Sequence, residues 1–136
     1  MLKALKILII IWAAMGILMG LGMLVVPQQM GAMQGYDVAG PAYVPYFLAS
    51  LGICLVVGSA FIIVAVTRDL LKNILWVQFA IAWAILAVAI TTYSMLMGFV
   101  AFEQVGMSII IDGAFFIAFM ALYPYRAVRS AARRRK

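Results

Sequence analysis

Hydrophobic side chains run along this sequence in four long stretches that short polar segments separate. A helix needs about 20 apolar residues to cross the hydrocarbon core of a bilayer. Stretches of about that length occupy residues 7–26, 44–66, 74–97 and 105–123. Backbone amides in lipid must be bonded internally, and no stretch alternates apolar and polar residues as a barrel strand does. The pattern predicts an all-α polytopic membrane protein with one four-transmembrane-helix bundle, residues 1–123, and a basic tail, residues 124–136.

The first apolar stretch has one feature of a secretory signal, because Lys3 and Lys6 precede it. A signal peptide has an apolar region of about 7–15 residues followed by a small-residue cleavage site. This stretch is 20 residues long, and no A-x-A-like site follows it. We therefore expect it to be retained as a membrane anchor. The glycine- and proline-rich residues 27–43 are predicted to form a loop.

The distribution of charge predicts the orientation of the chain. Hydrophobic residues are 68% and charged residues 10%, whereas a typical globular chain has about 45–50% and 25%. With four spans, the loops 27–43 and 98–104 carry no basic residue. Basic residues mark cytoplasmic segments, so we expect both termini in the cytoplasm and a multi-pass protein of the cell (inner) membrane. All ten basic residues then share one side: Lys3, Lys6, Arg68, Lys72, Arg126, Arg129, Arg133, Arg134, Arg135 and Lys136.

The residues available for chemistry are few. The sequence has no histidine and one cysteine, which excludes an intrachain disulfide and any metal or haem held by imidazole. No nucleophile–base pair, paired intramembrane carboxylates or phosphate-binding loop is present, so we expect a non-catalytic protein without a cofactor. Thioethers of Met15, Met19 and Met23 could bind copper(I), but we interpret this stripe as adaptable apolar filler.

Small residues at helical spacing predict how the spans pack. Helices in lipid associate through close packing of small side chains, because lipid tails are as apolar as leucine. Each of three spans carries such a series, so we expect a compact bundle. The predicted packing residues are Gly16 and Gly20 in the first span, Ser50, Cys54 and Gly58 in the second, and Ala80, Ala84 and Ala87 in the third.

Asp112 is the one charged residue well inside a span, and ionisable groups at such depth suggest function by default. Ser108 lies one turn away, and Thr91 and Thr92 lie at a similar depth in the third span. We expect these four residues to form an intramembrane polar cluster. Three interpretations stay open: a structural hydrogen bond between helices, pairing with a polar or basic group of a partner subunit, and proton or ion coupling.

The basic tail follows the last span. The spacing of Arg126, Arg129 and Arg133 would place them on one face of a helical continuation, with Arg134, Arg135 and Lys136 after them. Such a tail acts as an orientation signal, and it is predicted to contact anionic lipids or an acidic partner. No aromatic or folded platform accompanies the charges, so nucleic acid is not expected as a partner.

Five residues mark corresponding points of the four spans and their turns: Pro27 closes the first span, Gly52 lies in the second, Arg68 in the inner turn, Gly98 ends the third and Asp112 lies in the fourth. In these features the chain resembles the DoxX-like group of small four-helix membrane proteins of bacteria and archaea. Members often have an arginine near the second or third span that could face the acid, whereas this sequence has Thr91 and Thr92. The resemblance implies an accessory role, since some members are small subunits of membrane oxidoreductases.

These features together favour an accessory or assembly subunit of a larger membrane complex, with an electron-transfer complex as one candidate. The expected partners are membrane lipids and other membrane protein subunits. A small carrier, or a lipid- or quinone-binding module with a cavity near Asp112, is the first alternative. A self-assembling homo-oligomer is the second.

Overall fold

The computed structural model describes residues 1–34 and 43–133, and these form helices without any strand. Four of the described helices are long and apolar enough to cross a membrane. The prediction of an all-helical chain with four helices able to cross a membrane is therefore confirmed. The helices are α1 (Leu2–Val25), α2 (Pro27–Met33), α3 (Tyr43–Arg68), α4 (Ile74–Leu96), α5 (Phe102–Leu122) and α6 (Tyr125–Arg133).

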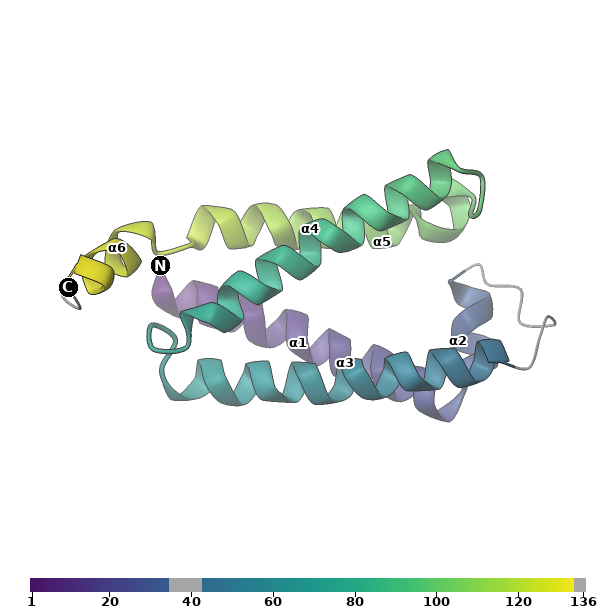
Figure 1. Cartoon of the computed structure of the whole chain (residues 1–136), viewed down its shortest axis with the longest axis horizontal. Helices are drawn as coiled ribbons and strands as arrows, with labels where there is room; N and C mark the ends of the chain where they lie inside the picture. Colours follow the sequence, from purple (N-terminus) through teal and green to yellow (C-terminus); the bar gives the residue numbers. More distant parts are fainter. Residues whose placement is uncertain (35–42, 134–136) are drawn as a thin grey trace.

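The start of α1, the α3–α4 turn and α6 lie at the same end of the molecule (Figure 1). We call it the basic end, and the opposite end, with α2 and the α4–α5 turn, the far end. The described basic residues therefore gather at one end, as the charge pattern predicted. They are Lys3, Lys6, Arg68, Lys72, Arg126 and Arg129, together with the backbone position of Arg133.

Helices α1 and α3 pack against each other so closely that their backbones touch. A Cβ atom added to Gly20 would lie 2.7 Å from the carbonyl oxygen of Gly52, and one added to Gly52 would lie 2.6 Å from the carbonyl oxygen of Gly20. Both distances are shorter than real Cβ contacts, so only glycine fits at these positions. The α1–α3 pair is thus held by the close approach that small residues permit in lipid.

In the described part of the chain, the core that the four long helices share lies near the basic end. Its fully buried side chains include Leu5 and Ile9 of α1, Ile62 of α3 and Phe119 of α5. The ring of Phe119 meets the ring of Trp12 edge-on, with centroids 5.9 Å apart. This core joins the α1–α3 pair to the α4–α5 pair.

Toward the far end the two helix pairs diverge (Figure 1). Only 17% to 22% of the apolar core of each span is buried inside the molecule. The side chains of α4 and α5 near this end are largely exposed; Ile90 is 67% exposed and Leu96 is 82% exposed. The expected compact bundle is therefore compact at one end only, and lipid or another protein must cover the rest.

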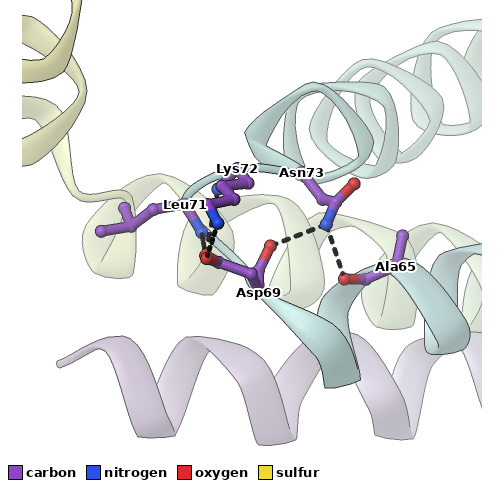
Figure 2. Close-up of polar contacts among 5 residues, drawn as sticks. All are labelled: Ala65, Asp69, Leu71, Lys72 and Asn73. Atoms are coloured by element: carbon purple, nitrogen blue, oxygen red, sulfur yellow. Dashed lines mark hydrogen bonds and ion pairs between the residues drawn. The ribbon is translucent and has the colours of Figure 1, made fainter.

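The turn between α3 and α4 is held by a local hydrogen-bond network (Figure 2). Asp69 Oδ1 accepts hydrogen bonds from the backbone N–H groups of Leu71 and Lys72, each 3.1 Å long. The side-chain amide of Asn73 donates to the carbonyl oxygens of Ala65, at 3.1 Å, and Asp69, at 2.8 Å. The same two carbonyl oxygens also accept backbone hydrogen bonds, that of Ala65 from the N–H of Asp69 and that of Asp69 from the N–H of Asn73. The side-chain bonds therefore reinforce a turn that backbone bonds already close.

The α4–α5 turn depends on a glycine. Gly98 has a φ of +72°, the one positive φ among the described residues. Its N–H donates to the carbonyl of Met95, and the N–H of Phe99 donates to the carbonyl of Ser94. These two bonds form a Schellman motif, in which glycine takes the left-handed conformation at little cost.

Two segments differ from the sequence prediction. Residues 27–33 form the short helix α2 instead of part of a loop, because Pro27 fits the first turn of a helix and the missing N–H costs nothing there. The tail does not continue α5, since Tyr123 is extended (φ −64°, ψ 129°) before Pro124. A residue before proline is disfavoured in a helix. The tail restarts as α6, a separate helix.

Candidate functional site

Asp112 lies at the middle of α5, ten residues from each end of the helix. At 1.5 Å per residue this is about 15 Å from either end, near the centre of a bilayer core about 30 Å thick. Phe119 is seven residues further on, so both residues lie on the same face of α5. Phe119 uses that face to contact α1 at the basic end. The side chain of Asp112 is only partly buried. The α4–α5 pair diverges from the α1–α3 pair toward the far end (Figure 1).

The carboxyl group of Asp112 has one hydrogen-bond partner among the described residues. Ser108 Oγ donates to Asp112 Oδ2 over 3.3 Å, from one turn away on the same helix. Hydroxyl hydrogen bonds are usually 2.5–3.0 Å long, so this one is weak. The carboxyl group therefore keeps acceptor capacity for a group outside the chain.

Among the described residues no hydrogen bond joins Asp112 to the third span, so the predicted four-residue cluster is formed only in part. Thr91 Oγ1 donates to the carbonyl oxygen of Ala87, and Thr92 Oγ1 donates to that of Val88, both over 2.8 Å. A hydroxyl in a helix can always reach the carbonyl four residues back, whatever its neighbours do. The structure thus brings Ser108 and Asp112 together and leaves both threonines bonded to their own helix.

The face of α1 opposite this site carries two of the three methionines singled out from the sequence. Leu8 and Trp12 pack against the core at the basic end. Met15 and Met19 continue the same helical face toward the far end and are 40% and 42% exposed. Met23 instead belongs to the α1–α3 contact and is buried. Flexible methionine side chains therefore line the open side of α1.

An apolar groove of about 310 Å³ lies between α1 and α5, on the basic-end side of Asp112. It is wide open to the surroundings rather than enclosed. Its lining has no polar side chain, so any ligand there is held by apolar contact. The lining residues are Leu8, Ile111, Ala114, Phe115 and Ala118.

The packing residues predicted for α1 lie at the α1–α3 contact, whereas those predicted for α3 do not. A Cβ atom at Gly16 would meet Ser59 Oγ at 2.5 Å. On α3, by contrast, Cys54 is exposed and a Cβ atom at Gly58 would meet nothing within 4 Å. Ser50 donates its hydroxyl to the carbonyl of Tyr46 within the same helix.

Two small residues of α3 that face α1 are Gly52 and Ser59, which the packing prediction did not include. Cys54 is two residues from Gly52, about 200° around the helix, so the predicted series lies on the wrong side. A signal was present: Leu48, Gly52, Ser59 and Ile62 form one helical stripe. On α4 the expected series holds in part, with Ala80 and Ala84 fully buried and Ala87 partly buried.

The tail arginines are placed as far as Arg133. Arg126 and Arg129 lie on α6 and are exposed. Arg133 is the last residue of α6. Arg134, Arg135 and Lys136 lie outside the described residues. The basic end also has a contact between helices, because Lys6 Nζ donates to the carbonyl oxygen of Thr67 over 2.8 Å.

No family model matches the chain, and no curated protein or solved structure matches it either. The resemblance to the DoxX-like group therefore stays a prediction from the sequence.

Proposed function

We propose that this protein is an accessory or assembly subunit of a larger membrane complex and has no catalytic site of its own. One observation carries the proposal. Asp112 lies at the middle of α5 with its side chain only partly buried, and the α4–α5 pair to which it belongs diverges from the α1–α3 pair toward the far end (Figure 1). An aspartate at the centre of a helix in lipid costs about 2.5–3.5 kcal/mol on insertion scales. A transmembrane helix of a partner that donates a hydrogen bond to Asp112 would offset this cost.

The surroundings of Asp112 fit a helix better than they fit a polar substrate. The groove beside it is apolar, and Met15 and Met19 border the open side. Methionine is unbranched and polarisable, so it adapts to the shape of a partner. A single acceptor in an apolar, adaptable surface is suited to one polar contact within a helix–helix interface.

The distribution of the basic residues supports the membrane placement. We assign both termini to the cytoplasm and the protein to the inner membrane of the cell, because basic segments stay on the cytoplasmic side. Cysteines placed at Lys3 or Phe99, with Cys54 replaced by serine, test this assignment. An impermeant maleimide added to sealed cells is expected to label position 99 and not position 3. Labelling at position 3 would contradict the orientation.

Purification in a mild detergent, followed by mass spectrometry of the co-purifying proteins, tests the subunit proposal. We expect a fixed, stoichiometric set of larger membrane proteins to accompany the wild-type chain. Asp112→Leu removes the acceptor and is expected to lose this set while the purified chain stays helical. Asp112→Asn keeps a carbonyl acceptor and is expected to retain most of it. Equal retention by both variants would contradict a role for Asp112 in the contact.

Two neighbouring substitutions test whether the side of α5 that carries Asp112 is the one that contacts the partner helix. Ser108 and Met107 are both exposed, but Met107 lies about 140° around the helix from Asp112. Ser108→Trp is expected to block the partner helix, and Met107→Trp is expected to leave the complex intact. If the tryptophan at position 107 dissociated the complex and the one at 108 did not, the proposed face would be wrong.

A lipid- or quinone-binding module is the second candidate, and the apolar groove next to Asp112 favours it. Its volume is at the lower end of the range for small-molecule sites. Purification of the chain alone, with one bound lipid or quinone that Ala114→Trp displaces, would support this candidate against the first. A symmetric oligomer of this chain alone would instead support self-assembly.

A further inference from the structure

A second groove lies at the basic end, on the side of the molecule formed by α4, α5 and the start of α6. It measures about 280 Å³ and is open to the surroundings. Unlike the groove beside Asp112, it combines polar and apolar side chains. Its lining residues are Gln78, Ile81, Ala82, Met120, Tyr123 and Tyr125.

The polar side chains are linked to one another at the basic end of the groove. Gln78 Nε2 donates to the hydroxyl oxygen of Tyr123 over 2.7 Å, which joins α4 to the end of α5. Because Tyr123 accepts this bond, its own hydroxyl hydrogen is available to a ligand. The rings of Tyr123 and Tyr125 meet edge-on, with centroids 4.7 Å apart. Tyr125 also reaches Met120, with its hydroxyl 3.6 Å from the sulfur.

The apolar side chains extend the groove from this polar end into the membrane. Ile81 and Ala82 lie three and four residues beyond Gln78 on α4, about one turn further toward the far end. The groove thus has a hydrogen-bonding end at the depth where tyrosine commonly marks the membrane–water interface. Its other end lies at the depth of lipid acyl chains.

Positive charge adjoins the polar end. Tyr125 is the first residue of α6, and Arg129 follows it by one turn, so both lie on the same side of that helix. Arg126 comes directly after Tyr125, and both arginines are exposed. No acidic residue occurs in α6, in the last turn of α5 or in the first turn of α4. The acidic residue of the α3–α4 turn, Asp69, pairs with another basic residue, since its carboxylate lies 3.8 Å from the ammonium group of Lys72.

We propose that this groove binds one anionic phospholipid of the leaflet that faces the basic end. Its phosphate accepts hydrogen bonds from Tyr123 and pairs with Arg126 and Arg129. One acyl chain lies along Ile81, Ala82 and Met120. The occupant is a lipid because the groove joins donors and positive charge at the interface to an apolar surface at chain depth, as the two ends of a phospholipid require. This site is separate from Asp112 and does not depend on the proposed subunit role.

Native mass spectrometry of the purified full chain, titrated with phosphatidylglycerol or phosphatidylcholine, tests the proposal. We expect one tightly retained phosphatidylglycerol and much weaker retention of phosphatidylcholine. A basic residue near an anionic surface changes affinity about fivefold, so Arg126→Gln with Arg129→Gln should weaken phosphatidylglycerol binding about 25-fold. Arg68→Gln removes an exposed charge from the same end but not from the groove, and is expected to change affinity less than twofold. A loss from Arg68→Gln as large as that from the double variant would show general charge attraction and overturn the site.

A pair of tryptophan variants tests the groove itself without altering charge. Ala82 and Ala89 are both exposed on nearly the same face of α4, two turns apart, and only Ala82 lines the groove. Ala82→Trp is expected to fill the groove and reduce phosphatidylglycerol retention at least tenfold, and Ala89→Trp is expected to leave retention unchanged. Unchanged retention in Ala82→Trp would overturn the proposal. Neither variant alters a buried side chain, so both should fold.

Discussion

The contact between Gly20 and Gly52 gives the sharpest test of how the bundle is held together. Gly20→Ala would place a Cβ atom 2.7 Å from the carbonyl oxygen of Gly52 and 2.9 Å from a methyl group of Val56. Ordinary contact begins at 3.4 Å, so α1 and α3 would have to separate by about 0.7 Å at this point. A gap of 0.5–1 Å forfeits a quarter to a half of the dispersion energy of the atoms involved.

The loss of stability in Gly20→Ala can be compared with that of the same substitution at a second glycine of the bundle. Adding a methylene to a well-packed contact typically costs about 1–3 kcal/mol. Gly58→Ala is the control, because its added Cβ atom would meet nothing within 4 Å. Both substitutions gain the same helix propensity, about 0.5–1 kcal/mol, so it cancels in the comparison. We expect Gly20→Ala to be less stable than Gly58→Ala by about 2 kcal/mol.

Unfolding in mixed micelles by titration with sodium dodecyl sulfate, followed by tryptophan fluorescence, measures this difference. The control should be as stable as the wild type or slightly more so. Two stabilities within about 0.5 kcal/mol of each other would refute the backbone contact, since an overpacked interface costs at least about 1 kcal/mol. A larger loss in Gly58→Ala would mean that α3 presents the opposite face to α1.

Three further outcomes are expected in the same unfolding assay. Gly16→Ala should destabilise the protein because its Cβ atom would lie 2.5 Å from Ser59 Oγ. Adding Ser59→Ala removes that oxygen and leaves the Ser59 Cβ atom 3.6 Å away, so the double variant should recover about 1 kcal/mol or more of stability. Strictly additive losses from the two substitutions would contradict the contact. Asp69→Ala should cost about 1 kcal/mol of stability, because it removes two hydrogen bonds to backbone N–H groups. Lys72→Gln removes only an exposed 3.8 Å ion pair and should cost less than about 0.5 kcal/mol. The reverse order of the two losses would contradict the turn network. Phe119→Ala should cost about 3 kcal/mol because the ring is fully buried, and a loss below about 1 kcal/mol would contradict its place in the core.

The sequence predicted the spans well because hydrophobic length alone determines them. An apolar run of about 20 residues must form a helix in lipid, so its limits can be read from the residues themselves. The short helix α2 was missed because glycine and proline suggest a loop. Pro27, however, is also a favoured first residue of a helix.

The depth of a residue in the membrane could be predicted from the sequence, but the rotation of each helix about its own axis could not. Counting residues places Thr91 and Asp112 at similar depths, yet it does not say which way each helix turns its side chains. The same limit explains the error on α3. Series of small residues occur on two of its sides, one with Cys54 and Gly58 and the other with Gly52. Which side of α3 packs against α1 depends on where the glycines of α1 lie. It is therefore a property of the two helices together and cannot be read from α3 alone.

The unequal packing of the two helix pairs bears on the proposed role. In lipid, helices approach closely only where small residues let their backbones meet, and α1 and α3 satisfy this condition with Gly20 and Gly52. The far half of α1 presents Met15 and Met19 on the side that faces α5, and these side chains are too large for such an approach. The divergence of the pairs therefore follows from side-chain size. A partner helix that contacts this open side would add the small surface that this side lacks. It would also add a second hydrogen-bond donor for Asp112, beside the weak bond from Ser108.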